Sequence, residues 1–147
     1  MNYVNSAVRK KDAISLVSGK PVYTGDMIPQ NTLVVKILRS PHAHAMIEDI
    51  DVSRALLVPG VACVLTYKDV PSSRYTTAGQ TYPEFSPYDK LILDPHIRCA
   101  GDPVAIIGAE TLEAAQRAMK LIKVTYKVLP ALIDYTNAID NPIIVHP

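Results

Sequence analysis

Two stretches of the chain alternate between apolar and polar positions, which is the pattern of half-buried strands. In residues 32–38, Leu33, Val35 and Ile37 fall on one face. Residues 122–128 alternate in the same way along their whole length. Two further runs are apolar without a polar face, which indicates buried strands. The pattern therefore predicts strands at 32–38, 61–66, 104–109 and 122–128, with shorter extended segments at 13–17 and 45–50.

Helical periodicity is clearest after Thr111, whose hydroxyl can cap the first turn of a helix. The apolar stripe of this helix repeats every three or four positions: Leu112, Ala115, Met119 and Ile122. The strand pattern that follows ends the helix near residues 120–121. Shorter helices are expected at 53–57 and after Asp134. Strands and helices mix without regular alternation of strand, helix and strand, which predicts an α+β fold in a single domain over residues 1–147.

Residues 71–90 form the longest stretch without either period. They carry four aromatic residues punctuated by prolines: Tyr75, Tyr82, Phe85 and Tyr88. Structureless connections of this length are uncommon in compact domains and are usually functional or disordered. The aromatic content disfavours disorder. We therefore expect a loop that packs either on a partner or over the core of its own domain.

Composition and charge exclude several classes of function. The 15 basic and 14 acidic residues are interleaved and leave a net charge of +1, whereas a nucleic-acid surface needs clustered cations. No apolar run approaches the length of a membrane span, and the first residues lack the features of a secretory signal. Cys63 and Cys99 are expected as free buried thiols in a reducing cytoplasm, with a disulfide or metal pair as the alternative.

Candidate catalytic residues are few. His42 and His44 would face the same way in an extended chain and could chelate a metal, but no third ligand is close in sequence. Hydrogen bonding in a turn or an interface is the alternative. Ser40 beside His42 is the one adjacent pair that could support nucleophilic catalysis, although triads are assembled by the fold rather than by adjacency. Residues 101–103 predict a turn before a strand, and a phosphate loop would instead open a helix.

Several motifs in a fixed order resemble those of one enzyme family. The first is Arg39-Ser-Pro-His-Ala-His-Ala45, and it is followed by Ile50-Asp51-x-Ser53-x-Ala55 and Pro59-Gly60-Val61. Downstream stand Arg98-x-x-Gly101-Asp102-Pro-Val-Ala105 and Val124-x-Tyr126-x-x-Leu129-Pro130. From about Arg9 to His146 the chain resembles the molybdenum hydroxylases, the xanthine dehydrogenases and aldehyde oxidases. The resemblance is to the N-terminal α/β-hammerhead domain of their molybdenum-binding subunit.

The resemblance implies a hammerhead domain of mixed strands with one main helix and short additional helices. Family members are oxidoreductases that hydroxylate purines or aldehydes at a molybdenum atom held by molybdopterin, and pass electrons through iron–sulfur clusters, usually to FAD. The residues that bind these cofactors, and the catalytic glutamate, belong to other domains and have no counterpart here. We therefore expect no catalytic, cofactor or metal residue in this chain, and no activity from it alone. Overall likeness favours xanthine as substrate, with aldehydes or other heterocycles left open.

The implied role is structural. The domain would dock on the remaining molybdenum-binding domains and on the iron–sulfur and FAD domains or subunits. The expected contact residues are Arg39, His44, Tyr82, Phe85 and Tyr88, because arginine and aromatics concentrate interface energy. The alternative is an independent metal-binding or ligand-binding protein that uses His42 and His44. We expect a cytoplasmic protein with a flexible lead-in at residues 1–8, either excised from a longer subunit or separately encoded.

Overall fold

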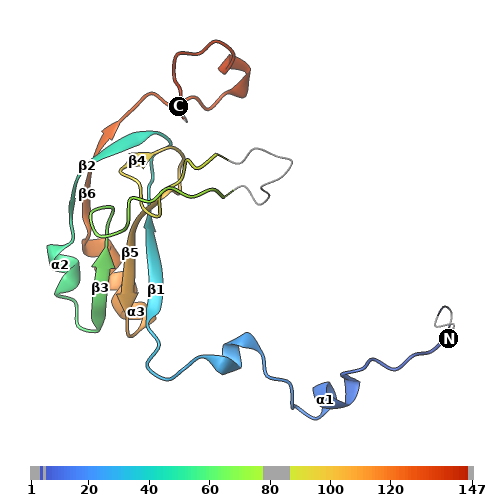
Figure 1. Cartoon of the computed structure of the whole chain (residues 1–147). Coiled ribbons are helices and arrows are strands. Elements are labelled where there is room, and N and C mark those ends of the chain that lie inside the picture. The colour runs from blue at the N-terminus through green and yellow to red at the C-terminus, as the bar shows by residue number, and fades with distance from the viewer. Residues whose placement is uncertain (1–3, 5, 78–86, 146–147) are drawn as a thin grey trace. The chain divides into compact units, whose positions relative to one another are not determined.

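The computed structural model describes residue 4, residues 6–77 and residues 87–145 (Figure 1). The chain divides into two compact units, residues 1–32 and residues 33–147, and each is described by itself. The predicted single domain stays a prediction.

The first unit contains the helix α1 (Ala13–Val17) and the 3₁₀ helix η1 (Thr24–Met27). The strand predicted at 13–17 is therefore wrong. The amides of Leu16 and Ser18 donate to the carbonyls of Asp12 and Ile14, so the backbone is satisfied locally. A strand here would need a neighbouring strand for the same bonds, and apolar content over five residues does not distinguish the two.

The second unit holds two three-stranded antiparallel sheets. The first sheet has the order β1-β5-β3, from β1 (Val34–Arg39), β5 (Pro103–Ala109) and β3 (Val61–Leu65), which lie side by side in Figure 1. The second has the order β4-β2-β6, from β4 (His96–Ile97), β2 (Ala45–Asp51) and β6 (Lys123–Val128). The helices are α2 (Ser53–Leu56), α3 (Leu112–Leu121) and the 3₁₀ helix η2 (Tyr135–Asn137). The predicted α+β class is confirmed.

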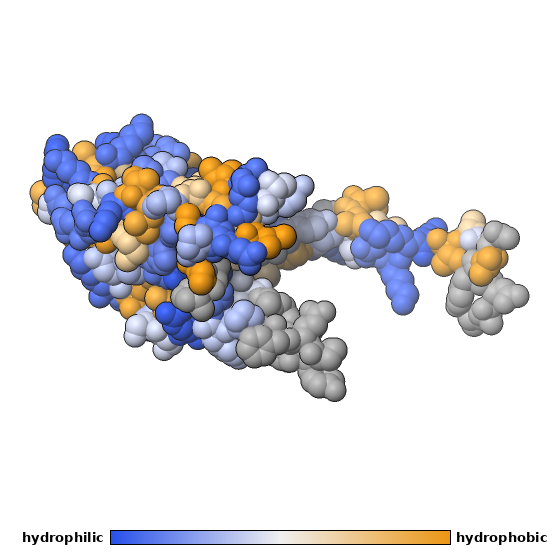
Figure 2. All heavy atoms as spheres, turned by 90° about the horizontal axis from the view of Figure 1, so that it is seen from above, coloured by the Kyte–Doolittle hydropathy of each residue, from blue (hydrophilic) through white to orange (hydrophobic). Residues whose placement is uncertain are grey.

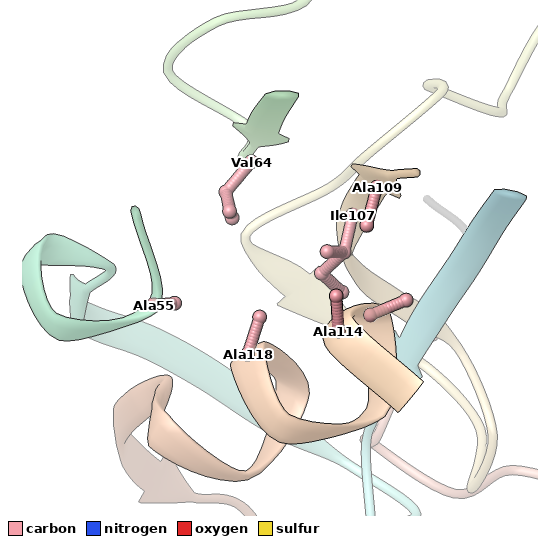
Figure 3. Packing of buried hydrophobic residues seen from close by; sticks show 7 residues of the cluster. Ala55, Val64, Ile107, Ala109, Ala114 and Ala118 are labelled. Atoms are coloured by element: carbon pink, nitrogen blue, oxygen red, sulfur yellow. The ribbon is translucent and has the colours of Figure 1, made fainter. Parts of the chain in front are cut away.

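Helix α3 packs on the first sheet through small side chains. Ala114, Ala115 and Ala118 are at most 2% exposed and lie against Val64 and Ile107 in one buried cluster (Figure 3). The predicted stripe is confirmed for Ala115, and Met119 and Ile122 are half-buried against the same cluster, but Leu112 is exposed. Alanine lets the helix axis approach the sheet closely, so the larger apolar residues are displaced to the edges of the contact.

The other side of the first sheet is apolar and open. In β1, Val35 and Ile37 are 58% and 39% exposed, whereas Val34 and Leu38 on the opposite face are half-buried. The register places Val35 beside Gly108 of β5, which in turn lies beside Cys63 of β3. An antiparallel sheet with one solvated face normally carries polar residues there.

A second buried cluster joins the two sheets. It contains Ala45, Ile47 and Ile50 of β2, Ile97 of β4, and Val104 and Ala105 of β5. The alternation predicted for β6 is present from Lys123 to Lys127, since Val124 and Tyr126 are half-buried and the residues between them are exposed. Val128 breaks the pattern by being exposed.

The cysteines are free, as expected, but neither is buried. Cys63 is half-buried because it lies on the open face of the first sheet, and Cys99 is exposed in the turn before β5.

In the described parts of the loop at 71–90, Tyr75 and Lys90 form an isolated antiparallel bridge with backbone hydrogen bonds of 2.9 and 3.1 Å. Tyr82 and Phe85 lie outside the described residues. Within the described ranges, no helix is long and apolar enough to cross a membrane.

The close packing of α3 leads to a stability prediction. Replacing Ala115 by leucine should lower the free energy of unfolding by about 1–3 kcal/mol, because the larger side chain forces the helix away from the sheet. Its exposed neighbour offers a matched control: Gln116→Leu should change the same quantity by less than about 0.5 kcal/mol. Urea unfolding of the two variants measures both. Equal losses would contradict the packing described for α3.

Candidate functional site

The two motif-bearing turns, residues 39–44 and 98–103, lie against each other. The Ser40 amide donates to the Asp102 carbonyl, and the Gly101 amide donates to the Ser40 carbonyl, each at 2.9 Å. The Arg39 guanidinium donates to the Gly101 carbonyl at 2.8 Å. Segments about sixty residues apart in sequence therefore form one joint, and we call residues 39–44 and 98–103 the turn junction.

Local chemistry explains why both segments turn here. Pro41 has no backbone N–H to donate to a neighbouring strand, so β1 ends before it. Gly101 has a φ of +95°, a conformation that side chains rarely tolerate. The Asp102 carboxylate accepts hydrogen bonds from the amides of Arg98 and Cys99, at 2.7 and 3.0 Å, and so closes the turn.

The Asp102 carboxylate is held in its charged form. Burial raises its pKa, but hydrogen bonds from the Cys99 thiol and from the amides of Arg98 and Cys99, with the charge of Lys90, bring the pKa below 3.8. Conversely, the hydrogen bond to Asp102, partial burial and the negative charge of Asp102 raise the pKa of the Cys99 thiol above 9.0. Cys99 is therefore a thiol rather than a thiolate near neutral pH, which makes it a poor nucleophile.

Arg98 connects the turn junction to two other parts of the second unit. Its guanidinium forms an ion pair with Asp94, in which the two side chains are only 13% and 19% exposed. Its Nε donates to the carbonyl of Val145 at 3.0 Å, near the C-terminal end of the described chain. The guanidinium of Arg98 therefore bonds to groups of the chain itself.

His44 and His96 form a ring pair beside the junction. Nδ1 of His44 lies 2.7 Å from the carbonyl oxygen of Pro130, and its Nε2 lies 2.9 Å from Nε2 of His96. A carbonyl oxygen only accepts, so the proton on His44 is assigned to Nδ1. In the neutral ring Nε2 then accepts, and His96 donates from its own Nε2. The rings thereby link the residue before β2, strand β4 and the segment after β6.

His42 takes a different neighbour. Its ring lies edge-on to Tyr126, with the ring centroids 4.8 Å apart. The Ser40 hydroxyl donates to the His42 carbonyl at 3.2 Å and accepts from the His42 amide at 3.0 Å. Ser40 thus contacts the backbone of His42 rather than its imidazole. Burial raises the pKa of Tyr126, against a smaller lowering by a hydrogen bond with Ser40.

The predicted contact residues that the structure describes differ in their exposure to solvent. Arg39 is exposed at the junction, and Tyr88 is 65% exposed in the loop. His44 is only 9% exposed, and both of its ring nitrogens have partners within the chain. Its contact with His96 was not expected, because the two residues lie 52 positions apart in sequence. Asp94 was also missed, although its spacing of four residues from Arg98 is a usable signal.

A small polar cavity of about 90 Å³ lies next to the junction. It is lined by Tyr75, Lys90, Leu91, Asp94, His96, Arg98, Asp102 and Pro103. Its charged groups are largely engaged with one another or with the backbone. Among the described residues, no three histidine, cysteine, aspartate or glutamate side chains gather to hold a metal ion. The hydrogen bonds and the ion pair of this arrangement can rigidify the crossing of the two chain segments.

The fold and this junction match known proteins over most of the chain. The family model described as "Aldehyde oxidase and xanthine dehydrogenase, a/b hammerhead domain" matches residues 18–130. "Probable hypoxanthine oxidase XdhD" of Escherichia coli is 44% identical over 137 residues, which are 92% of this chain and 14% of that protein. Xanthine dehydrogenase/oxidase of Rattus norvegicus is 39% identical over 126 residues, 84% of this chain and 9% of that protein.

Solved structures agree with these matches. The aldehyde oxidoreductase of Desulfovibrio desulfuricans aligns with a TM-score of 0.79 and 30% identity, over 97% of this chain and 16% of that one. The Desulfovibrio gigas aldehyde oxidoreductase aligns with a TM-score of 0.76 and 32% identity, over 93% of this chain and 16% of that one. The chain therefore spans between 9% and 16% of the length of these four proteins.

The charged state of Asp102 leads to a prediction about pH. Its pKa is lowered on folding, so its contribution to stability is present above the unfolded pKa and is lost as the pH falls through the folded value, below 3.8. Asp102→Asn should lower the free energy of unfolding by about 1 kcal/mol at neutral pH, the figure being modest because the carboxylate is partly solvated. The loss should shrink toward zero in acid. Urea unfolding between neutral pH and pH of about 3 measures this.

The exposed residue Glu48 provides the control, because it lies in β2 away from the turn junction. Glu48→Gln should leave the neutral-pH stability nearly unchanged. A loss in Asp102→Asn that stays constant over the whole pH range would show that the charge of Asp102 is not what stabilises the turn.

Proposed function

Because the chain belongs to the α/β-hammerhead family of aldehyde oxidases and xanthine dehydrogenases, we propose that it acts as a docking domain of a molybdenum hydroxylase. The turn junction would hold the two sheets in a fixed relation, and the outer surfaces of the domain would contact the rest of the enzyme. Catalysis would take place outside this chain.

The observation that carries this proposal is the open apolar face of the first sheet. Val35 and Ile37 on one side of β1, and Leu33 directly before the strand, are all substantially exposed. On the face drawn in Figure 2, too, hydrophobic side chains reach the surface in several places among hydrophilic ones. Contiguous exposed apolar surface in a folded domain typically marks a contact with another protein. A partner covering it would remove that surface from water.

The cofactors of the family do not fit the cavity at the turn junction. A ligand pocket for a group as large as molybdopterin or FAD spans several hundred Å³, whereas this cavity holds about 90 Å³. An iron–sulfur cluster takes four protein ligands, usually cysteines, and the sequence has two cysteines. We therefore propose that molybdopterin, iron–sulfur clusters and FAD are held by other domains or subunits, which would be the docking partners.

Within the proposed docking role, the predicted contact residues divide by position. Arg39 and Tyr88 are exposed and could touch a partner directly, and we propose the same role for Tyr82 and Phe85. His44 is buried, so its contribution would be to hold the backbone after Pro130 in place. By likeness to the xanthine and hypoxanthine enzymes named above, we propose purine hydroxylation in the cytoplasm as the activity of the assembled enzyme.

The proposal that catalysis takes place outside this chain gives a prediction. The purified chain alone should not hydroxylate hypoxanthine, xanthine or an aldehyde, because the molybdopterin and the redox cofactors are proposed to be held by other domains or subunits. Spectrophotometric assays with an artificial electron acceptor measure this. Turnover that increases with the concentration of the purified chain would overturn the proposal.

The loop gives a second prediction. Tyr82→Ala, Phe85→Ala and Tyr88→Ala together should weaken assembly with the molybdenum-containing protein by about tenfold or more, because interface aromatics carry much of the binding energy. Their effect on the free energy of unfolding of the chain should be small. Binding is measured by titration calorimetry and stability by urea unfolding. If the variant unfolds while assembly of the surviving folded protein is unchanged, the loop covers the core instead.

A further inference from the structure

A second hollow in this unit shares no lining residue with the cavity at the turn junction. It is a wide, open groove of about 580 Å³, and it lies where the C-terminal end of α2 meets α3. We call it the α2–α3 groove, and its lining residues are Arg54, Leu57, Val58, Pro59, Arg117, Lys120 and Leu121.

The lining combines aliphatic and cationic residues, and we call these two groups the apolar floor and the cationic rim. Four of the residues are aliphatic, and Leu57 among them is 82% exposed. The other three are Arg54, Arg117 and Lys120, so the lining carries three positive charges and no acidic residue. An aliphatic side chain of a partner can pack against a solvent-exposed leucine in such a groove.

The cations of the rim are not neutralised within the described chain. Neither arginine nor Lys120 takes part in an ion pair there. Glu113, one helical turn before Arg117, is exposed and makes no such pair with it. Arg54 acts on Asp51 only at a distance, as the weakest cause of the lowered pKa of that carboxyl. The rim is therefore available to carboxylates of another molecule.

We propose that the α2–α3 groove binds an acidic, aliphatic segment of another part of the molybdenum hydroxylase. Charge complementarity selects carboxylates for the rim, and the apolar floor selects a leucine-like anchor between them. The matched relatives are about six to eleven times longer than the aligned part, which means that in them the domain is joined to much more protein. This inference rests on the proposed docking function.

Nucleic acid is a poorer fit for the same surface. Three cations around an aliphatic floor give few phosphate contacts, and the chain as a whole carries a net charge of only +1. A second copy of this chain would have to place acidic residues in the groove of the first, and this possibility is an outcome of the test below.

The experiment measures assembly of the full chain with the molybdenum-containing protein from its own cells. Arg117→Glu with Lys120→Glu should weaken the association by about tenfold or more, and so should Leu57→Asp. The association of the unaltered chain should weaken as salt is raised, because the rim is exposed. The matched control is Lys123→Glu with Lys127→Glu, which makes the same change in net charge on exposed positions of β6 and should alter the association less than about twofold.

A photocrosslinking residue in place of Leu57 then identifies the occupant. The expected product joins position 57 to a segment of the hydroxylase that has aliphatic residues between carboxylates. Reversing those carboxylates to lysine should restore association of the Arg117→Glu, Lys120→Glu variant. A crosslink to a second copy of this chain, to nucleic acid or to a basic segment would overturn the inference.

The outcomes separate the two proposals. If the unaltered chain associates with the molybdenum-containing protein and all groove variants associate equally well, the groove inference fails and the docking function stands. If the unaltered chain does not associate with it at all, both fail.

Discussion

The reciprocal backbone hydrogen bonds between Ser40 and residues 101–102 hold together two segments in which the chain passes from one sheet to the other. Strand β1 belongs to the first sheet and β2 to the second, so the chain changes sheet within residues 40–44. The chain passes between the sheets again at every later step from strand to strand, and the passage from β4 to β5 lies within residues 98–102. The β1–β2 and β4–β5 crossings occur at one place, where each satisfies polar groups of the other. Two small sheets that are individually marginal are thereby held as one packed body.

The polar side chains that gather at the turn junction are bonded mainly to one another and to the backbone. An active site needs groups whose hydrogen-bonding capacity is left for a substrate. At this junction Asp102 accepts from two amides and a thiol, and Arg98 is bonded to a carboxylate and to backbone carbonyls. Even the histidine pair ends on a carbonyl oxygen. The polar groups stabilise the crossing, because burying them unpaired would cost more than the fold could offset.

Strand periodicity could be predicted well from the sequence, because a two-residue repeat is visible wherever a face is buried. Prediction from the sequence is limited where the structure of a segment depends on which other segment packs against it. Residues 13–17 are apolar enough for a strand but have no strand beside them, so they form the helix α1. The buried positions of α3 are alanines because contact distance, rather than hydrophobicity alone, selects them. The ring pair of His44 and His96 could not be foreseen, because it depends on the pairing of β2 with β4.

The bridge between Tyr75 and Lys90 has a consequence for how such a domain can vary. The backbones of Tyr75 and Lys90 are bonded to each other, so these two positions are held together whatever the length of the chain between them. Lengthening a closed loop costs little, about 0.6 kcal/mol for each doubling. Insertions and deletions between these two residues should therefore be nearly neutral for the fold. Natural selection can then rebuild this segment for a new partner while the sheets keep the same sequence.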